Sequence, residues 1–132
     1  MLKGGCHCGG IRYEAEGESL HHAICHCSDC RHAAGAPMVG WIAFPSGHVR
    51  VTAGATKIRP SSEHGRRHFC PDCGTGLFYT NEAALPGLTD IQSGTLDDGG
   101  EAPPPGVHIQ YAEHLAWVDE IGALHKFERY PG

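Results

Sequence analysis

Three cysteines in one short segment, Cys25-His26-Cys27-Ser28-Asp29-Cys30, carry the clearest signal for chemistry in this sequence. Cys25 and Cys27 are two positions apart, so both side chains leave the same face of an extended strand. Cys27 and Cys30 have the C-x-x-C spacing, which lets a tight turn bring two sulfurs onto one metal ion. A zinc ion held by three protein ligands keeps an open position and is typical of a reactive site, whereas structural zinc is normally closed by four. The spacing therefore predicts a reactive metal site on these three thiols.

The other four cysteines form two pairs that lie far apart in the sequence, Cys6 with Cys8 and Cys70 with Cys73. The segment Cys70-Pro71-Asp72-Cys73-Gly74 is typical of a metal-binding knuckle, because proline fixes the turn and the trailing glycine lets backbone amides face the sulfurs. One knuckle supplies only two ligands, and the N-terminal pair is the favoured complement, giving a closed structural site that stabilises the fold. The spacing leaves two alternatives open: Cys25 and Cys27 joining the knuckle instead, or iron in place of zinc.

Histidine and arginine patterns carry weaker signals. His22 and His26 are four apart, but Ala23 stands where a metalloprotease motif needs glutamate, so this pair does not predict a protease. His26 lies on the opposite strand face from its cysteine neighbours and is a poor ligand candidate. The pair Arg66-Arg67 is more typical of a solvated face than of an anion site.

Length, charge and the N-terminal residues argue against several classes of protein. With 132 residues, the chain is long enough for one domain, 1–132, and too short for two ordinary ones. The formal charge is -5 and no run of Lys and Arg occurs, which argues against nucleic-acid binding. No stretch approaches the roughly 20 apolar residues that span a bilayer, so no membrane association is expected. The first residues lack a secretory signal, which predicts a reducing cytoplasm, where clustered cysteines bind metal more often than they form disulfides.

Short strands separated by turns dominate the predicted elements, because Gly (19) and Pro (9) are abundant. Apolar alternation and short apolar runs predict strands at 11–16, 20–26, 38–44, 49–51, 57–59, 77–79, 90–96 and 107–111. Polar or Pro-rich stretches predict loops at 60–65, around Pro86 and at 97–106. Ser28 or Asp29 caps a short predicted helix that stops at Gly35, which places Cys30 in its first turn. The sequence thus predicts an all-β fold with at most one short helix.

The ordered cysteine clusters resemble the glutathione-dependent formaldehyde-activating (GFA-type) family, to which centromere protein V also belongs. The resemblance covers nearly the whole chain and is carried by Gly5-Cys6-His7-Cys8-Gly9, Ile11-Arg12-Tyr13, Cys25-His26-Cys27-Ser28-Asp29-Cys30-Arg31, Gly35-Ala36-Pro37, Phe69-Cys70-Pro71-Asp72-Cys73-Gly74, Leu96-Asp97-Asp98, and Val107-His108-Ile109 before Trp117. It implies a β-tent-like, zinc-anchored single domain. It also implies two zinc ions per chain, a structural one on Cys6, Cys8, Cys70 and Cys73 and a catalytic one on Cys25, Cys27 and Cys30.

The activity that this resemblance implies is the addition of glutathione to formaldehyde, giving S-(hydroxymethyl)glutathione; the reverse is a carbon–sulfur lyase step. A metal deprotonates a bound thiol, and only the thiolate attacks a carbonyl carbon. Three thiolate ligands donate charge to zinc, which favours thiol chemistry over hydrolysis. Arg66 and Arg67 are candidates to meet the carboxylates of glutathione. Two hypotheses compete: a non-catalytic zinc module that carries a thiol or binds a protein partner, and a lyase acting on another thiol adduct.

Overall fold

A computed structural model describes residues 1–98 and 101–132 of the protein. Its α-helix is α1 (Ser28–Ala34), and its 3-10 turns include η1 (Ser46–His48), η2 (Ser93–Thr95), η4 (Tyr111–Glu113) and η5 (Ala116–Ala123). The strands are β1 (Leu2–Gly5), β2 (Arg12–Ala15), β3 (His21–Cys25), β4 (Val39–Pro45), β5 (Val49–Ala53), β6 (Lys57–Pro60), β7 (Gly65–Phe69), β8 (Gly76–Asn81), β9 (Leu85–Gln92) and β10 (Val107–Ile109). The predicted fold class, all-β with one short α-helix, is confirmed.

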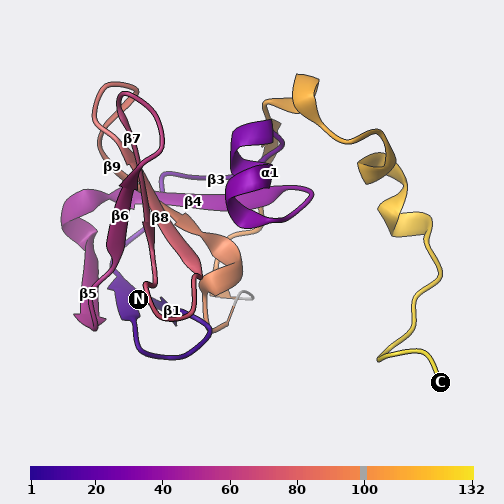
Figure 1. Ribbon diagram of the computed structural model, residues 1–132, viewed down its shortest axis with the longest axis horizontal. Helices are drawn as coiled ribbons and strands as arrows, with labels where there is room; N and C mark the ends of the chain where they lie inside the picture. The colour runs from indigo at the N-terminus through magenta and orange to yellow at the C-terminus, as the bar shows by residue number, and fades with distance from the viewer. Residues whose placement is uncertain (99–100) are drawn as a thin grey trace.

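The strands form two sheets that share a buried interior (Figure 1). The smaller sheet has the order β1-β2-β5, and the larger one has the order β10-β3-β4-β9-β8-β7-β6. Neighbouring strands run antiparallel except for β10, which pairs in parallel with β3. A parallel partner needs a long connection, and β10 indeed follows all the other strands of the larger sheet in the sequence.

The main core lies between the sheets and is built from one face of each. Ile42 from β4 and Ile91 from β9 are fully buried there, and Tyr13 of β2 packs against them from the smaller sheet. The neighbouring residue Trp41 points to the opposite face of the larger sheet, where it packs with Cys30 of α1. Both faces of β4 are therefore buried, which accounts for its nearly continuous apolar sequence.

Tyr13 links the two sheets, because its hydroxyl lies 2.7 Å from Thr95 Oγ1 in η2, directly after β9. Thr95 Oγ1 donates its own proton to the Gln92 carbonyl, so Tyr13 is the donor in this pair. Replacing Tyr13 with phenylalanine should lower the free energy of unfolding by about 1 kcal/mol, because a buried hydrogen bond is lost at nearly constant volume. Urea titration followed by circular dichroism measures this. Tyr130→Phe, at a position 97% exposed, is the matched control, and equal stabilities of the two variants would contradict the link.

Two strands of the structure, β1 and β7, are not predicted from the sequence. β1 contains two glycines and one large apolar residue, yet all four of its residues pair with β2. β7 has the polar sequence Gly65-Arg66-Arg67-His68-Phe69 and lies between β6 and β8. A strand inside a sheet is specified by its neighbours as much as by its own apolar pattern, so neither segment carries a local signal.

Several predicted boundaries are wrong by a few residues. Pro86, predicted to lie in a loop, is part of β9, but it precedes Leu88, the first β9 residue paired with β4, so its missing N–H leaves that ladder intact. The strand predicted at 90–96 ends at Gln92 and continues as η2. The strand predicted at 107–111 ends at Ile109 and leads into η4. The centre of the loop predicted at 97–106, residues 99–100, lies outside the described residues.

The chain after β10 leaves the two sheets as a succession of 3-10 turns and extended backbone (Figure 1). Val118 is buried, whereas Trp117, Leu124 and Phe127 are exposed. Among the described residues, neither core cluster draws a member from this segment. None of the helices in the same residues has the length and apolarity that crossing a membrane requires.

Candidate metal and substrate site

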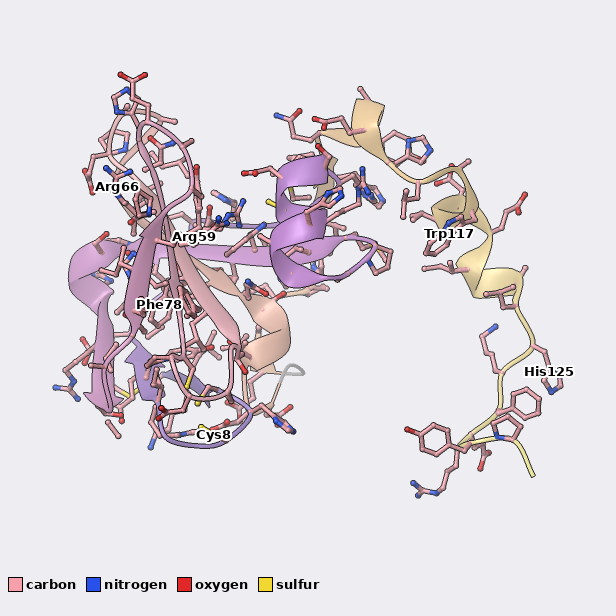
Figure 2. All side chains as sticks on the ribbon, in the orientation of Figure 1. Cys8, Arg59, Arg66, Phe78, Trp117 and His125 are labelled. Carbon is pink, nitrogen blue, oxygen red and sulfur yellow. The ribbon has the colours of Figure 1, made fainter. Side chains whose placement is uncertain are left out.

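Four cysteine sulfurs from distant parts of the sequence meet beside the smaller sheet. Cys6 follows β1, Cys8 lies in the turn before β2, and Cys70 and Cys73 lie in the turn between β7 and β8. The four Sγ atoms lie within 4.8 Å of one another. The Cys6 and Cys8 sulfurs are 3.5 Å apart, and those of Cys8 and Cys70 are 3.9 Å apart. Figure 2 shows Cys8 at the end of the sheets that lies away from α1.

Hydrogen-bond donors surround this four-cysteine cluster. The Ile11 amide donates to Cys6 Sγ at 3.2 Å, and the Cys73 amide donates to Cys70 Sγ at 3.4 Å. Hydrogen bonds from Thr75 lower the pKa of Cys73 to about 5, which favours its thiolate. Gly74 has a φ of 82°, a left-handed conformation that a Cβ would strain, so the knuckle needs glycine here.

Three further sulfurs meet where β3 joins α1. Cys25 ends the strand, Cys27 precedes the helix, and Cys30 lies in its first turn, as predicted. The Cys25 and Cys27 sulfurs are 3.4 Å apart, and all three Sγ atoms lie within 4.8 Å of one another. Cys27 Sγ accepts a hydrogen bond from the Cys30 amide at 3.2 Å, so Cys27, and not Ser28 or Asp29, is the N-cap of α1. Over the described residues, no fourth His, Cys, Asp or Glu joins this group.

The two cysteine groups fit zinc in both chemistry and spacing. A tetrahedral zinc with Zn–S bonds of about 2.3 Å holds its sulfurs about 3.8 Å apart. The sulfur–sulfur contacts of 3.5 and 3.9 Å in the first group and 3.4 Å in the second are close to that value. All seven cysteines are free of disulfides. The structure therefore brings together a set of four and a set of three thiols, and not the alternative in which Cys25 and Cys27 join the knuckle.

Arg67 is the main charged neighbour of the three-cysteine cluster. Its Nη2 lies 3.6 Å from Cys30 Sγ and 2.8 Å from Asp29 Oδ2, and its guanidinium lies over the Tyr79 ring at 5.1 Å. Hydrogen bonds from Cys25, then Cys27 and Arg67, lower the pKa of Cys30 to about 5 against the opposing effect of burial. The positive charge of Arg67 beside Cys30 Sγ therefore favours the thiolate form of this side chain.

The prediction of a solvated Arg66-Arg67 pair is wrong for Arg67, which is only 8% exposed. The two side chains leave opposite faces of β7, as neighbours in a strand do. Arg66 donates to the carbonyls of Ser62 and Glu63 in its own loop, and Figure 2 shows it at the outer end of the sheet, away from α1. Arg67 alone therefore reaches the cysteine cluster.

A polar row crosses the same face of the larger sheet. Strand register aligns, in order from β6 to β3, Arg59, Arg67, Tyr79, Asp90, Ala43 and His21. Asp90 is 8% exposed, and burial raises the pKa of its carboxyl although His21 lies 3.5 Å away. Sequence reasoning missed this row, because five strand pairings must be known before its members align.

The C-terminal part of the chain supports the cysteine-bearing strand. In the β3–β10 pairing, Ile109 is the partner of Cys25. The buried His26 ring contacts His108 at 2.8 Å between Nε2 and Nδ1, and the Ser28 amide donates to Glu113 Oε1 at 3.1 Å. His26 belongs to neither cysteine group among the described residues, and its ring packs against His108 instead.

Comparison with known proteins adds a family relationship to this geometry. The family model for glutathione-dependent formaldehyde-activating enzymes matches residues 1–113. A protein of Halomonas elongata, provisionally named as such an enzyme, is 27% identical over 90% of this chain and 80% of its own. A Penicillium rubens protein with the same provisional name is 31% identical over 92% of this chain and 69% of its own. An uncharacterized lyase of Schizosaccharomyces pombe is 32% identical over 60% of this chain and 58% of its own.

A solved structure shares the fold. The crystal structure of a Rhodobacter sphaeroides protein superimposes with a TM-score of 0.59 at 24% identity, covering 76% of this chain and 97% of the other. At this level of identity, the likeness concerns the arrangement of strands alone.

Proposed function

The chain belongs to the glutathione-dependent formaldehyde-activating enzyme family, and from that membership we propose that it is a zinc-dependent carbon–sulfur lyase. In the proposed reaction, the thiol of glutathione adds to formaldehyde or a related aldehyde. The sulfur forms a bond to the carbonyl carbon, the thiol loses its proton, and the carbonyl oxygen gains one. The proposed setting is the cytoplasm, where glutathione keeps thiols reduced.

The observation that carries the proposal is the difference between the two cysteine groups. Cys25, Cys27 and Cys30 offer three sulfurs, whereas the other group offers four. We assign the group of four to a structural zinc and the group of three to a catalytic zinc, because a tetrahedral ion with three protein ligands can accept a ligand from solution. Zinc in the second group would hold a substrate thiol as its thiolate, the form that attacks carbonyl carbon.

Side chains around the three-cysteine group stabilise negative charge on its sulfurs. The Arg67 guanidinium faces Cys30 Sγ at 3.6 Å. Trp41 and Tyr79 pack around the cysteines and exclude water from one side of them. Electrostatic attraction is stronger where water is excluded, so Arg67 favours an anionic sulfur at the cluster more than an exposed arginine would.

Cobalt substitution tests the proposal. The purified chain should bind two zinc ions, and after exchange for cobalt, glutathione should shift the thiolate-to-cobalt absorption bands of one site. S-methylglutathione, which has no free thiol, is the matched control and should leave those bands in place. Formaldehyde consumption in the presence of glutathione then completes the case for an enzyme. Shifted bands without turnover would favour a thiol carrier, and unshifted bands would favour a purely structural module.

A further inference from the structure

A pocket of about 350 Å³ lies between α1 and the end of the larger sheet formed by β6, β7 and β8, and Arg67 in its lining contacts Cys30 of the three-cysteine cluster. Its lining includes His32 of α1, Arg59 of β6, Arg67 of β7, and Gln92 of β9. Figure 2 shows Arg59 on the side of the sheet that faces α1. A volume at the lower end of the range for small-molecule sites fits one end of a tripeptide-sized ligand.

The described pocket lining contains two arginines and no acidic residue. Arg59 and Arg67 are direct partners in the β6–β7 register, so their side chains start side by side on one face of the sheet. Like charges placed opposite each other are destabilising unless a counter-charge lies nearby. Asp29 supplies one for Arg67, but Arg59 has no ion pair among the described residues, and no Asp or Glu lines the pocket. One positive charge is therefore left for an anion from solution.

Arg67 also has an unused donor. Its Nη2 is engaged by Asp29 and Cys30, whereas its Nε is buried and has no hydrogen-bond partner in the described chain. A buried donor without a partner costs about 1–3 kcal/mol. Planar guanidinium groups bind carboxylates with particular strength, because two parallel N–H donors match two oxygens.

A neutral donor completes the lining. The Gln92 side-chain amide makes no hydrogen bond to any other described residue and lies against Gly76, where a Cβ would come within 2.4 Å of Gln92 Nε2. Glycine at this position leaves space for the amide at the wall of the pocket. Two guanidinium groups and an amide are a donor set suited to a carboxylate.

We propose that this pocket binds a carboxylate of the substrate thiol and thereby selects thiols with an anionic end. The inference rests on the proposed function, since it assigns the pocket to the same substrate. Arg67 connects the two parts, because it lines the pocket and also contacts Cys30. One molecule with its sulfur at the cysteines and its carboxylate in the pocket would satisfy both.

The test separates pocket binding from catalysis. Binding of S-methylglutathione, which keeps both carboxylates but has no free thiol, is measured by calorimetry on the zinc-loaded chain. Arg59→Gln should raise its dissociation constant about tenfold, the effect of losing a charged hydrogen bond. Arg50→Gln is the matched control: Arg50 is an exposed arginine on β5 of the other sheet, paired with Glu14, and its loss should leave binding unchanged.

Selectivity among thiols is the second measurement. Wild-type protein should use glutathione with a kcat/KM about tenfold above that for glutathione diethyl ester, and Arg59→Gln should bring this ratio toward one. If no thiol is turned over but S-methylglutathione still binds in a way that depends on Arg59, the proposed lyase activity is refuted. The carboxylate pocket is then still supported. If kcat/KM is the same for glutathione and its diethyl ester, and the same in wild-type and Arg59→Gln protein, the carboxylate pocket is refuted and the lyase activity is still supported. Inorganic phosphate that displaces S-methylglutathione as well as acetate does would show a general anion site and overturn the selection of carboxylates.

Discussion

Replacing Cys30 with serine should reduce turnover of glutathione and formaldehyde on the order of a thousandfold, while the protein stays folded. Serine is a poor zinc ligand, so the group of three thiols would fall to two, and the thiolate that Arg67 faces would be lost. Cys30 lies in the smaller core cluster, away from the main one, so the free energy of unfolding should fall by only about 1 kcal/mol. Steady-state kinetics and urea titration of the same preparation measure the two effects.

Ser28→Ala is the control for Cys30→Ser. Ser28 lies in the same helical turn, is exposed, and engages its neighbours through its backbone amide and carbonyl. Its loss should change turnover less than twofold. Full activity of Cys30→Ser would remove this thiol from the reaction and leave the three-cysteine cluster without a catalytic role.

Replacing Cys73 with serine should instead abolish the cooperative fold. The four-cysteine group ties the N-terminal turn to the β7–β8 turn and borders the main core, in which Cys6 and Cys70 are buried. Zinc binding to a structural site contributes roughly 10–16 kcal/mol, as much as or more than the whole stability of a typical domain. Far-UV circular dichroism and zinc content of the purified variant should both show the loss, and a chelator should reproduce it in the wild-type protein.

Asp72→Ser is the matched control for Cys73→Ser, because Asp72 is exposed in the same knuckle and belongs to neither ligand group. It should remain folded with two zinc ions. Similar losses of stability and activity in the Cys30 and Cys73 variants would contradict the division into a catalytic and a structural site.

The site is predictable from sequence where its parts are local. Cys27 and Cys30 lie three apart, and Gly35 ends the helix in a left-handed conformation (φ 62°), so the spacing alone places Cys30 in the first turn of α1. Spacing favours the grouping of the thiols into four and three without excluding the alternative, and the arrangement in space matches the favoured grouping. Their role as zinc ligands stays a prediction.

The rest depends on contacts between segments that lie far apart in the chain. Arg67 follows a polar loop and looks solvated in the sequence, but β6 and β8 on either side of it turn its side chain toward α1. Asp90 joins the same face only through the pairings of β9 with β4 and β8. Neither residue lies in a motif, and one-residue changes of register would send both to the other face.

The placement of the two cysteine groups bears on how such proteins diverge. Of the four-cysteine group, Cys6 and Cys70 belong to the core between the sheets, whereas the three-cysteine group belongs to the smaller cluster with Val39 and Trp41. The proposed pocket is lined by Arg59, Arg67 and Gln92, of which Arg67 contacts Cys30, and it also borders the four-cysteine knuckle at Phe69 and Gly74. Mutations at Arg59 or Gln92 would therefore change the proposed pocket without replacing a cysteine of either group, whereas a mutation at Gly74 would alter the pocket and strain the four-cysteine knuckle together.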